Sequence, residues 1–263
     1  MPDAGRSRLI GELTFLEIPK ALSESSILCL PIGSIEQHGP HLPLNTDVVL
    51  AEGFTRAIVS RWGEALDLWQ LPTMPISLAR EHEWASGSMS LSIQGMVALI
   101  RDYGREIARA LPARNLVVVN GHGGNRGILE ALAQDLRADF GLNACVLHLL
   151  ELAEDGVQAA IPEIHGGKTE TSIMLTLAPH LVRRDLIAQL KKPPDGQAIR
   201  KTILDKGVSW PWTSDDKRLA TLGVIGDAQA ASAEYGQQAI DRVVEMAGGI
   251  LKQLLDNRHN SNR

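Results

Sequence analysis

Residues 115–125 read NLVVVNGHGGN, an apolar run that leads directly into a polar segment rich in glycine. The run Asn115–Val119 is short and rich in valine, which is typical of a strand buried on both faces of a sheet. Glycines on both sides of His122 let the backbone bend sharply and let a ligand approach closely. This stretch therefore predicts a buried strand that ends in a candidate functional loop.

Similar apolar runs occur before and after this strand, and longer amphipathic segments separate them. Further strands are expected at Ile27–Ile32, Leu66–Leu71 and Ala144–Leu149. Helices are expected over about 47–61, 92–111, 126–139, 169–178 and 232–256. The alternation predicts an α/β fold with a mainly parallel sheet covered by helices on both faces. In such a sheet, ligands bind beyond the carboxyl ends of the strands.

Length and composition fit one soluble domain over 1–263, with 44% apolar and 22% charged residues. The net charge of −5 argues against a dedicated nucleic-acid binder, which would need basic residues to meet phosphates. The sequence contains no uncharged apolar run of about 18 residues, so it predicts no membrane span. The N-terminal residues lack the apolar core of a signal peptide, which indicates a cytoplasmic protein. Cys29 and Cys145 lie in apolar runs and are expected to be buried small hydrophobes.

One segment departs from the strand and helix pattern. Residues 191–222 are polar, contain prolines and carry Trp210 and Trp212. We expect a long excursion over the surface, either a lid or an oligomer contact.

The loop after the first strand, residues 33–47, reads GSIEQHGPHLPLNTD. In extended backbone Glu36 and His38 point to the same face, and a carboxylate beside an imidazole suits Zn, Mn or Fe. The turn that follows could bring Asp47 back to this pair. Asp47 also lies at the start of a predicted helix, where a carboxylate is favourable without any function. This loop alone fits a metal site and an ordinary polar loop equally well.

The NGHGGN segment also has two interpretations. A glycine loop before a helix can cradle a phosphate. However, no Lys and Ser/Thr complete a Walker-type pattern, and the spacing G-x-G-x-x-G is absent. In combination with the Glu36, His38 and Asp47 loop, His122 favours a metal site.

A third polar segment, HGGKTETS, covers residues 165–172. Thr169 and Glu170 could simply cap the following helix and interact with its dipole. In the functional alternative, Glu170 reaches a metal ion and His165 transfers protons, which suits a group with a pKa near neutrality.

Two weaker candidates lie elsewhere in the chain. The polar stretch with His82, Trp84 and Ser86–Ser88 could line a pocket. Asp227, in the turn GVIGD at 223–227, could either cap the next helix or support a ligand.

The motifs GSIEQHGPHLPLNTD, NGHGGN, HGGKTETS and GVIGD, in this order, resemble the creatininase (creatinine amidohydrolase) family over about residues 27–236. The resemblance implies a single domain with a three-layer α-β-α sandwich, a two-metal centre and a homohexamer. It also implies a metal-dependent amidohydrolase that cleaves a carbon–nitrogen bond of a cyclic or non-standard amide, such as a lactam or a formamide.

The resemblance also assigns metal ligands to this chain. By position, Glu36, Asp47 and His122 would hold one metal ion, and His38 with the shared Asp47 would hold part of the second. In creatininase itself, a glutamate two residues after the NGH histidine completes the second site, whereas this chain has Gly124 there. We expect Glu170 from the neighbouring motif to take that place.

The mechanism that the resemblance implies uses two divalent ions about 3.5–4 Å apart, Zn, Mn or Fe, with a hydroxide between them. Asp47 would bridge the ions, and His165 would protonate the leaving nitrogen. Gln37 and Asn125 are expected to orient the ligands and to fix an imidazole tautomer.

Two departures make creatinine itself an unsuitable substrate. Besides the missing glutamate at Gly124, creatininase has a tryptophan four residues before the proton-transfer histidine, and this chain has Ile161. The NGHGGN form resembles relatives that act on formamides of pyrimidine precursors and on a modified peptide. The alternatives are therefore a metallopeptidase for a modified peptide and a non-catalytic metal or small-molecule binder. A Ser or Cys nucleophile is disfavoured, because no G-x-S-x-G motif is present.

Overall fold

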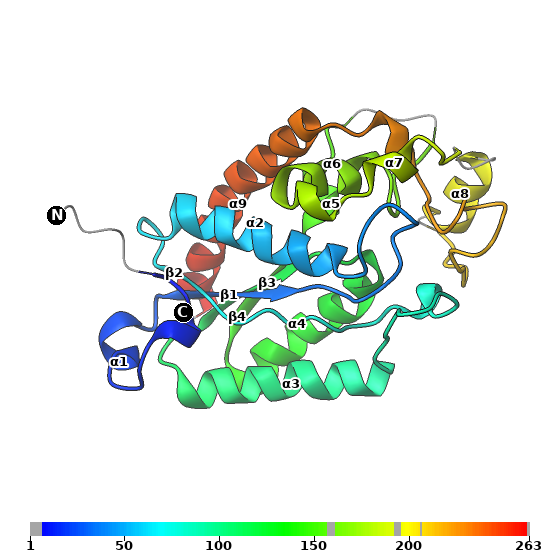
Figure 1. The fold of residues 1–263 in the computed structure, drawn as a ribbon. Coiled ribbons are helices and arrows are strands. Elements are labelled where there is room, and N and C mark those ends of the chain that lie inside the picture. The colour runs from blue at the N-terminus through cyan, green and yellow to red at the C-terminus, as the bar shows by residue number, and fades with distance from the viewer. Residues whose placement is uncertain (1–6, 157–160, 192–195, 206, 262–263) are drawn as a thin grey trace.

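The computed structural model describes residues 7–156, 161–191, 196–205 and 207–261 (Figure 1). In this part of the chain, four parallel strands form one sheet in the order β2-β1-β3-β4. The strands are β1 (Ile27–Ile32), β2 (Leu68–Gln70), β3 (Asn115–Asn120) and β4 (Asn143–His148). The prediction of an α/β fold with a parallel sheet is confirmed.

Helices cover both faces of this sheet (Figure 1). One face carries α2 (Thr46–Trp62), α5 (Leu149–Ala153), α6 (Lys168–Leu177) and α9 (Ala233–Ser261). The other face carries α3 (Ile93–Ala110) and α4 (Arg126–Phe140). Side chains of β1 alternate between two apolar cores, with Ile27 in the first and Leu28 in the second, as the period of a strand requires. The result is the three-layer α-β-α sandwich that the resemblance implied.

The remaining described elements are short. They are η1 (Ile10–Glu12), α1 (Ile18–Ala21), η2 (Arg80–His82), η3 (Gly123–Asn125), η4 (Pro179–Leu181), α7 (Arg184–Ile187), α8 (Gly196–Thr202) and η5 (Ala228–Ala230). None of the described helices is long and apolar enough to cross a membrane.

The expected elements differ from the observed ones mainly at their ends. The strand expected at Leu66–Leu71 is only Leu68–Gln70, because Asp67 has a left-handed backbone (φ 49°) and belongs to the preceding turn. Cys29 is buried as expected, whereas Cys145 is only partly buried because β4 lies at the edge of the sheet. Neither cysteine forms a disulfide.

The pairing of β1 with β3 positions the functional loops. Their register runs from Ile27 opposite Asn115 to Ile32 opposite Asn120, so both strands end side by side. The next residue of each chain segment is a glycine. A Cβ on Gly33 or Gly121 would come within 3.0 Å of the backbone at the start of α2. The two glycines therefore let the first turn of α2 approach both strand ends.

The segment 191–222 is a surface excursion only in part. Trp210 is 58% exposed, but Ile199 of α8 is buried in a small core with Leu219 and Ile225. Ser214 is also completely buried. Residues 192–195 and 206 lie outside the described residues.

Candidate metal centre

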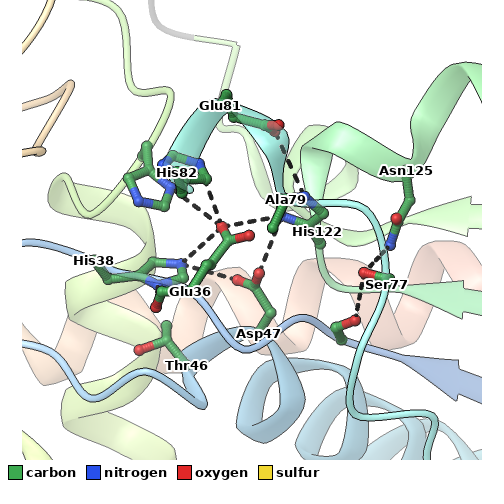
Figure 2. A network of polar contacts seen from close by, with 12 residues as sticks. Glu36, His38, Thr46, Asp47, Ser77, Ala79, Glu81, His82, His122 and Asn125 are labelled. Carbon is green, nitrogen blue, oxygen red and sulfur yellow. Dashed lines mark hydrogen bonds and ion pairs between the residues drawn. The ribbon is translucent and has the colours of Figure 1, made fainter. Parts of the chain in front are cut away.

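The three predicted loops meet beyond the carboxyl ends of β1 and β3. Glu36 and His38 follow β1, Asp47 lies in the first turn of α2, and His122 follows β3. Figure 2 shows these four side chains pointing toward one another. All four are almost completely buried. The fold thus brings together residues that are as far as 86 positions apart (36 to 122).

Short contacts join these side chains. Nδ1 of His122 lies 3.1 Å from Oε1 of Glu36 and 3.1 Å from Oδ2 of Asp47. Nε2 of His38 lies 2.9 Å from Oδ1 of Asp47, at hydrogen-bond distance. The two oxygens of Asp47 therefore face different imidazoles.

The third motif also reaches this cluster. Oε1 of Glu170, in the first turn of α6, lies 3.9 Å from Nε2 of His38. Nδ1 of His165 lies 3.7 Å from Oε1 of Glu36, and its ring centroid is 4.2 Å from that of His38. The structure therefore gathers all six residues that the sequence singles out as ligands or proton carriers.

These residues form overlapping sets of donor atoms. In each set, the nitrogen and oxygen atoms lie within 4.8 Å of one another. The sets are Glu36 with Asp47 and His122, His38 with Asp47 and Glu170, and Glu36 with His38 and His165. The first two sets share Asp47, and they mix nitrogen and oxygen donors as Zn, Mn and Fe sites do.

Several polar atoms of the cluster are buried without a hydrogen bond. Among the described residues, neither carboxylate oxygen of Glu36 has a hydrogen-bond partner, nor has Oδ2 of Asp47. Burying a carboxylate is costly unless it is paired or binds a metal ion. The residues present therefore fit a bound cation.

The electrostatics of the cluster support the same conclusion. Burial raises the pKa of Glu36 to about 7 and that of Glu170 to about 7. Burial alone would lower the pKa of His38, but the carboxylates of Asp47 and Glu170 raise it to about 10. For Asp47, the nearby imidazoles outweigh burial and hold its pKa well below the usual range. Metal binding to such a cluster displaces protons from its ligands.

The surroundings of His165 lower its pKa, whereas those of His38 raise it. Burial first, and then the charge on His38, lower its pKa well below its usual value. Its Nε2 lies 2.5 Å from the backbone oxygen of Gln37, which leaves Nδ1 directed at Glu36. His165 is therefore neutral near pH 7, and its pKa lies below the near-neutral value that the sequence analysis assumed for a proton carrier.

A comparison with known protein families identifies the chain. The model of the family described as "Creatinine amidohydrolase" matches residues 11–250. The chain belongs to the creatininase family. The expectation of an enzyme from a family that hydrolyses carbon–nitrogen bonds is confirmed at this level.

Individual relatives agree with this assignment. A "Mycofactocin precursor peptide peptidase" of Mycobacterium tuberculosis is 32% identical over 250 residues, which are 91% of this chain and 90% of the relative. The solved structure "Creatininase Mn" is 26% identical with a TM-score of 0.72, covering 96% of this chain and 99% of its own. A creatininase mutant of the "Zn-Zn type" is 25% identical with a TM-score of 0.74, covering 96% of this chain and 98% of its own.

Gln37, predicted to orient ligands, contacts this creatininase-family site directly. Its Nε2 lies 3.0 Å from Nδ1 of His82 and 3.1 Å from Nε2 of His165, and it donates to Oγ of Ser214 over 2.9 Å. Its Oε1 accepts a hydrogen bond from the backbone of Gly39. Gln37 thus connects the E-x-H loop to the histidines beside it.

Asn125, the other residue predicted to orient ligands, lies at the end of η3 in the NGHGGN segment. Its side chain donates to Asn120 over 3.1 Å and to Ser77 over 3.0 Å, and it accepts from the backbone of Leu78. Asn120 in turn donates to the backbone oxygen of His122 over 2.8 Å. Asn125 therefore supports, through Asn120, the backbone of the loop that carries His122.

His82 belongs to the site, although the sequence indicated only a pocket-lining residue. It lies on η2, with Nε2 at 3.5 Å from Oε1 of Glu36, and its ring stacks on His165 at 4.0 Å. Burial and the neighbouring histidines lower its pKa. Trp84 and Ser88 of the same stretch also reach the site, through Ser214 and the backbone of Gln37 respectively.

Sequence reasoning missed Glu81 and Ser214. Oε1 of Glu81 lies 3.6 Å from Nε2 of His122. Oγ of Ser214 lies within hydrogen-bond distance of His82, Trp84 and Gln37. The position of Glu81 beside His82 was an available signal, whereas Ser214 lies in a segment with no motif.

The two departures from creatininase have structural counterparts. A Cβ on Gly124 would fall within 3.0 Å of Oε1 of Glu81 and of Nε2 of His122, so a side chain at 124 would have to displace the Glu81 carboxylate or the His122 ring. Ile161 packs against the small core of Ile199, which also includes the ring of Trp212.

Asp227, a weaker candidate of the sequence analysis, precedes η5, and its backbone N–H donates to Glu163 over 3.0 Å.

Proposed function

We propose that the protein is a metal-dependent amidohydrolase that cleaves a carbon–nitrogen bond of a non-standard amide. The observation that carries the proposal is the position of Asp47, whose carboxylate belongs to two adjacent sets of donor atoms. A carboxylate shared between two sets of mixed donors suits a pair of adjacent divalent ions.

Each set has a role in the proposal. Glu36, Asp47 and His122 hold one divalent ion, and His38 and Glu170 hold the second together with Asp47. Two such ions, when bound, lower the pKa of a water molecule and polarise the amide carbonyl. Zinc, manganese and iron all suit these donors, and creatininase structures named for manganese and zinc support the first two.

His165 transfers the proton. Its ring would take up at Nδ1 the proton that the attacking water loses, because Nε2 is held by the backbone oxygen of Gln37. It then delivers this proton to the leaving nitrogen of the amide. General acid–base catalysis of this kind contributes about 10²–10⁴-fold to a rate.

The substrate that the proposal favours is an amide in a modified peptide. The peptidase relative of Mycobacterium tuberculosis is 32% identical to this chain over 250 residues, and a "Creatinine amidohydrolase" of Pseudomonas putida is 29% identical over 271 residues. Glycine at position 124, where creatininase has a glutamate, argues against creatinine. A small lactam or formamide is the second candidate, because the same donor sets would act on any amide carbonyl.

The test is an assay of protein reloaded with zinc, manganese or iron against modified peptides, lactams and formamides. We expect metal-dependent release of an amine from at least one class. Asp47→Ala and His122→Ala should abolish turnover and lower the metal content, whereas His180→Ala, at an exposed position, should change neither. Unchanged metal content in both site variants would refute the proposal, and full metal occupancy without any turnover would favour a non-catalytic binder.

We also propose that the protein forms the homohexamer that the resemblance implies and that it is located in the cytoplasm. Sedimentation of the purified protein measures its oligomeric state, and a dimer or a monomer would refute the hexamer.

A further inference from the structure

Glu81 turns its carboxylate toward His122 on the side away from the metal donors (Figure 2). Oε1 of Glu81 lies 3.6 Å from Nε2 of His122, and Nδ1 of the same ring faces Glu36 and Asp47 at 3.1 Å. The imidazole therefore has a carboxylate at each of its two nitrogens. The Glu81 side chain is itself largely buried, at 16% exposure.

His122 Nε2 needs such a partner. It is buried, and the described part of the chain offers it no hydrogen bond. A histidine that binds a metal ion through one nitrogen almost always donates a hydrogen bond from the other, commonly to a carboxylate. Glu81 requires a movement of only a few tenths of an ångström to accept this hydrogen bond.

Gly124 makes room for this pair. A Cβ at position 124 would fall within 3.0 Å of both Oε1 of Glu81 and Nε2 of His122. The backbone at Gly124 does not have a positive φ, so its conformation does not require glycine. The narrow space between Glu81 and His122 is what favours glycine at position 124.

The segment 191–222 holds Glu81 in place. The backbone N–H of Ser214 donates to the backbone oxygen of Glu81 over 3.0 Å. The neighbouring His82 is fixed by Oγ of Ser214 at 2.7 Å and reaches Glu36 at 3.5 Å. The short helix η2 is therefore fixed beside Nε2 of His122.

We propose that Glu81 is a positioning residue that accepts the Nε2 proton of His122 and so directs Nδ1 toward the metal ion held with Glu36 and Asp47. This inference rests on the proposed metal centre. It also assigns a purpose to Gly124, whose missing side chain allows the carboxylate to reach the ring.

The test measures the dissociation constant of Zn²⁺ by competition with a chromophoric chelator. For Glu81→Ala we expect about 10–100-fold weaker binding, the usual cost of losing the partner of a metal-bound histidine. Glu81→Gln should recover most of the affinity, because its amide oxygen still accepts the proton. Gly124→Ala should weaken binding as Glu81→Ala does, and Glu83→Ala, at an exposed position in the same stretch, should have no effect.

A second readout separates positioning from folding. The visible spectrum of the Co²⁺-loaded protein reports the geometry around the ion, and it should change in Glu81→Ala but stay close to wild type in Glu81→Gln. A Zn²⁺ affinity of Glu81→Ala within twofold of wild type would overturn the inference while leaving the metal centre intact. A wild-type protein that binds no metal would overturn the proposed function and this inference together. If Glu81→Ala does not fold, Glu81→Gln and Gly124→Ala decide: wild-type affinity in Gly124→Ala would overturn the inference.

Discussion

Asp47 and His38, nine positions apart in the chain, form a hydrogen bond of 2.9 Å between Oδ1 and Nε2, and both side chains are buried. The other oxygen of Asp47 faces His122. One carboxylate thus joins the loop after β1 to the loop after β3. This geometry makes Asp47 the residue on which the whole site depends.

Asp47→Asn should remove both metal ions rather than one. The variant keeps the volume of the side chain but loses the negative charge that both donor sets share. We expect activity to fall by about 100-fold or more, since even the loss of an outer partner of a ligand costs 10–100-fold. Elemental analysis of the purified variant checks the prediction, and a variant that retains one full equivalent of metal would contradict it.

Glu170→Gln should lower the occupancy of the second ion only. Oε1 of Glu170 faces His38, while Oε2 accepts a hydrogen bond from the backbone of Gly166. Glutamine keeps this local hydrogen-bonding capacity and loses the charge that a metal ion needs. Metal titration should give about half the wild-type stoichiometry. Full stoichiometry would mean that Glu170 binds no metal ion and only stabilises the first turn of α6.

The meeting of the three loops could be predicted from the sequence for a physical reason. Loops that follow parallel strands emerge at the same edge of a sheet, so the residues after Ile32 and after Asn120 had to come close. Asp47 and Glu170 could be placed because each lies in the first turn of an expected helix, where a carboxylate is favourable. Most residues of the site could therefore be located from the motifs and from the expected starts of the helices.

The remaining contacts depend on tertiary structure that leaves no local pattern. Glu81 and His82 lie on a three-residue helix in a stretch without apolar periodicity. Ser214 reaches the site from a segment whose sequence predicts a surface excursion, and its contacts there are with Glu81 and Gln37, which are distant in the chain. The neighbouring His82 was the one signal for Glu81, and Ser214 had none.

His165→Ala should retain its metal and lose turnover. Its Nε2 is engaged by the backbone of Gln37 and its Nδ1 faces Glu36, so Nδ1 is the atom placed for proton transfer. We expect a loss of about 10²–10⁴-fold in kcat with an unchanged metal content. His165 also lies within reach of Glu36 and His38 as a third possible donor set. A loss of metal in this variant would identify it as a ligand instead.

His41 should make the fold sensitive to mild acid. Burial lowers its pKa from 6.5 to about 4, and its Nε2 lies 2.8 Å from Oγ1 of Thr171. Between these two pH values the unfolded chain binds a proton at this position and the folded chain does not. Stability is therefore lost as the pH falls from about 6.5 to about 4, by up to about 3 kcal/mol.

Urea unfolding of wild type and His41→Gln, each at several pH values between 4 and 7, measures this contribution. The variant should lose less stability than wild type over the same range. His180→Gln, at an exposed position, should follow wild type. Parallel curves for wild type and His41→Gln would contradict the prediction.

Gly33→Ala should damage the site through the fold, without touching a ligand. Its new Cβ would lie within 3.0 Å of the backbone of Val48 and Asp47, and neither can move without shifting the first turn of α2. Overpacking of this kind costs about 1–3 kcal/mol. The displacement also separates Asp47 from His122, so we expect lower stability and weaker Zn²⁺ binding together. Gly127→Ala provides a matched control, because a Cβ there meets no atom within 4 Å. If Gly33→Ala lost stability but bound Zn²⁺ like wild type, the close approach of α2 would serve the core alone and not the site.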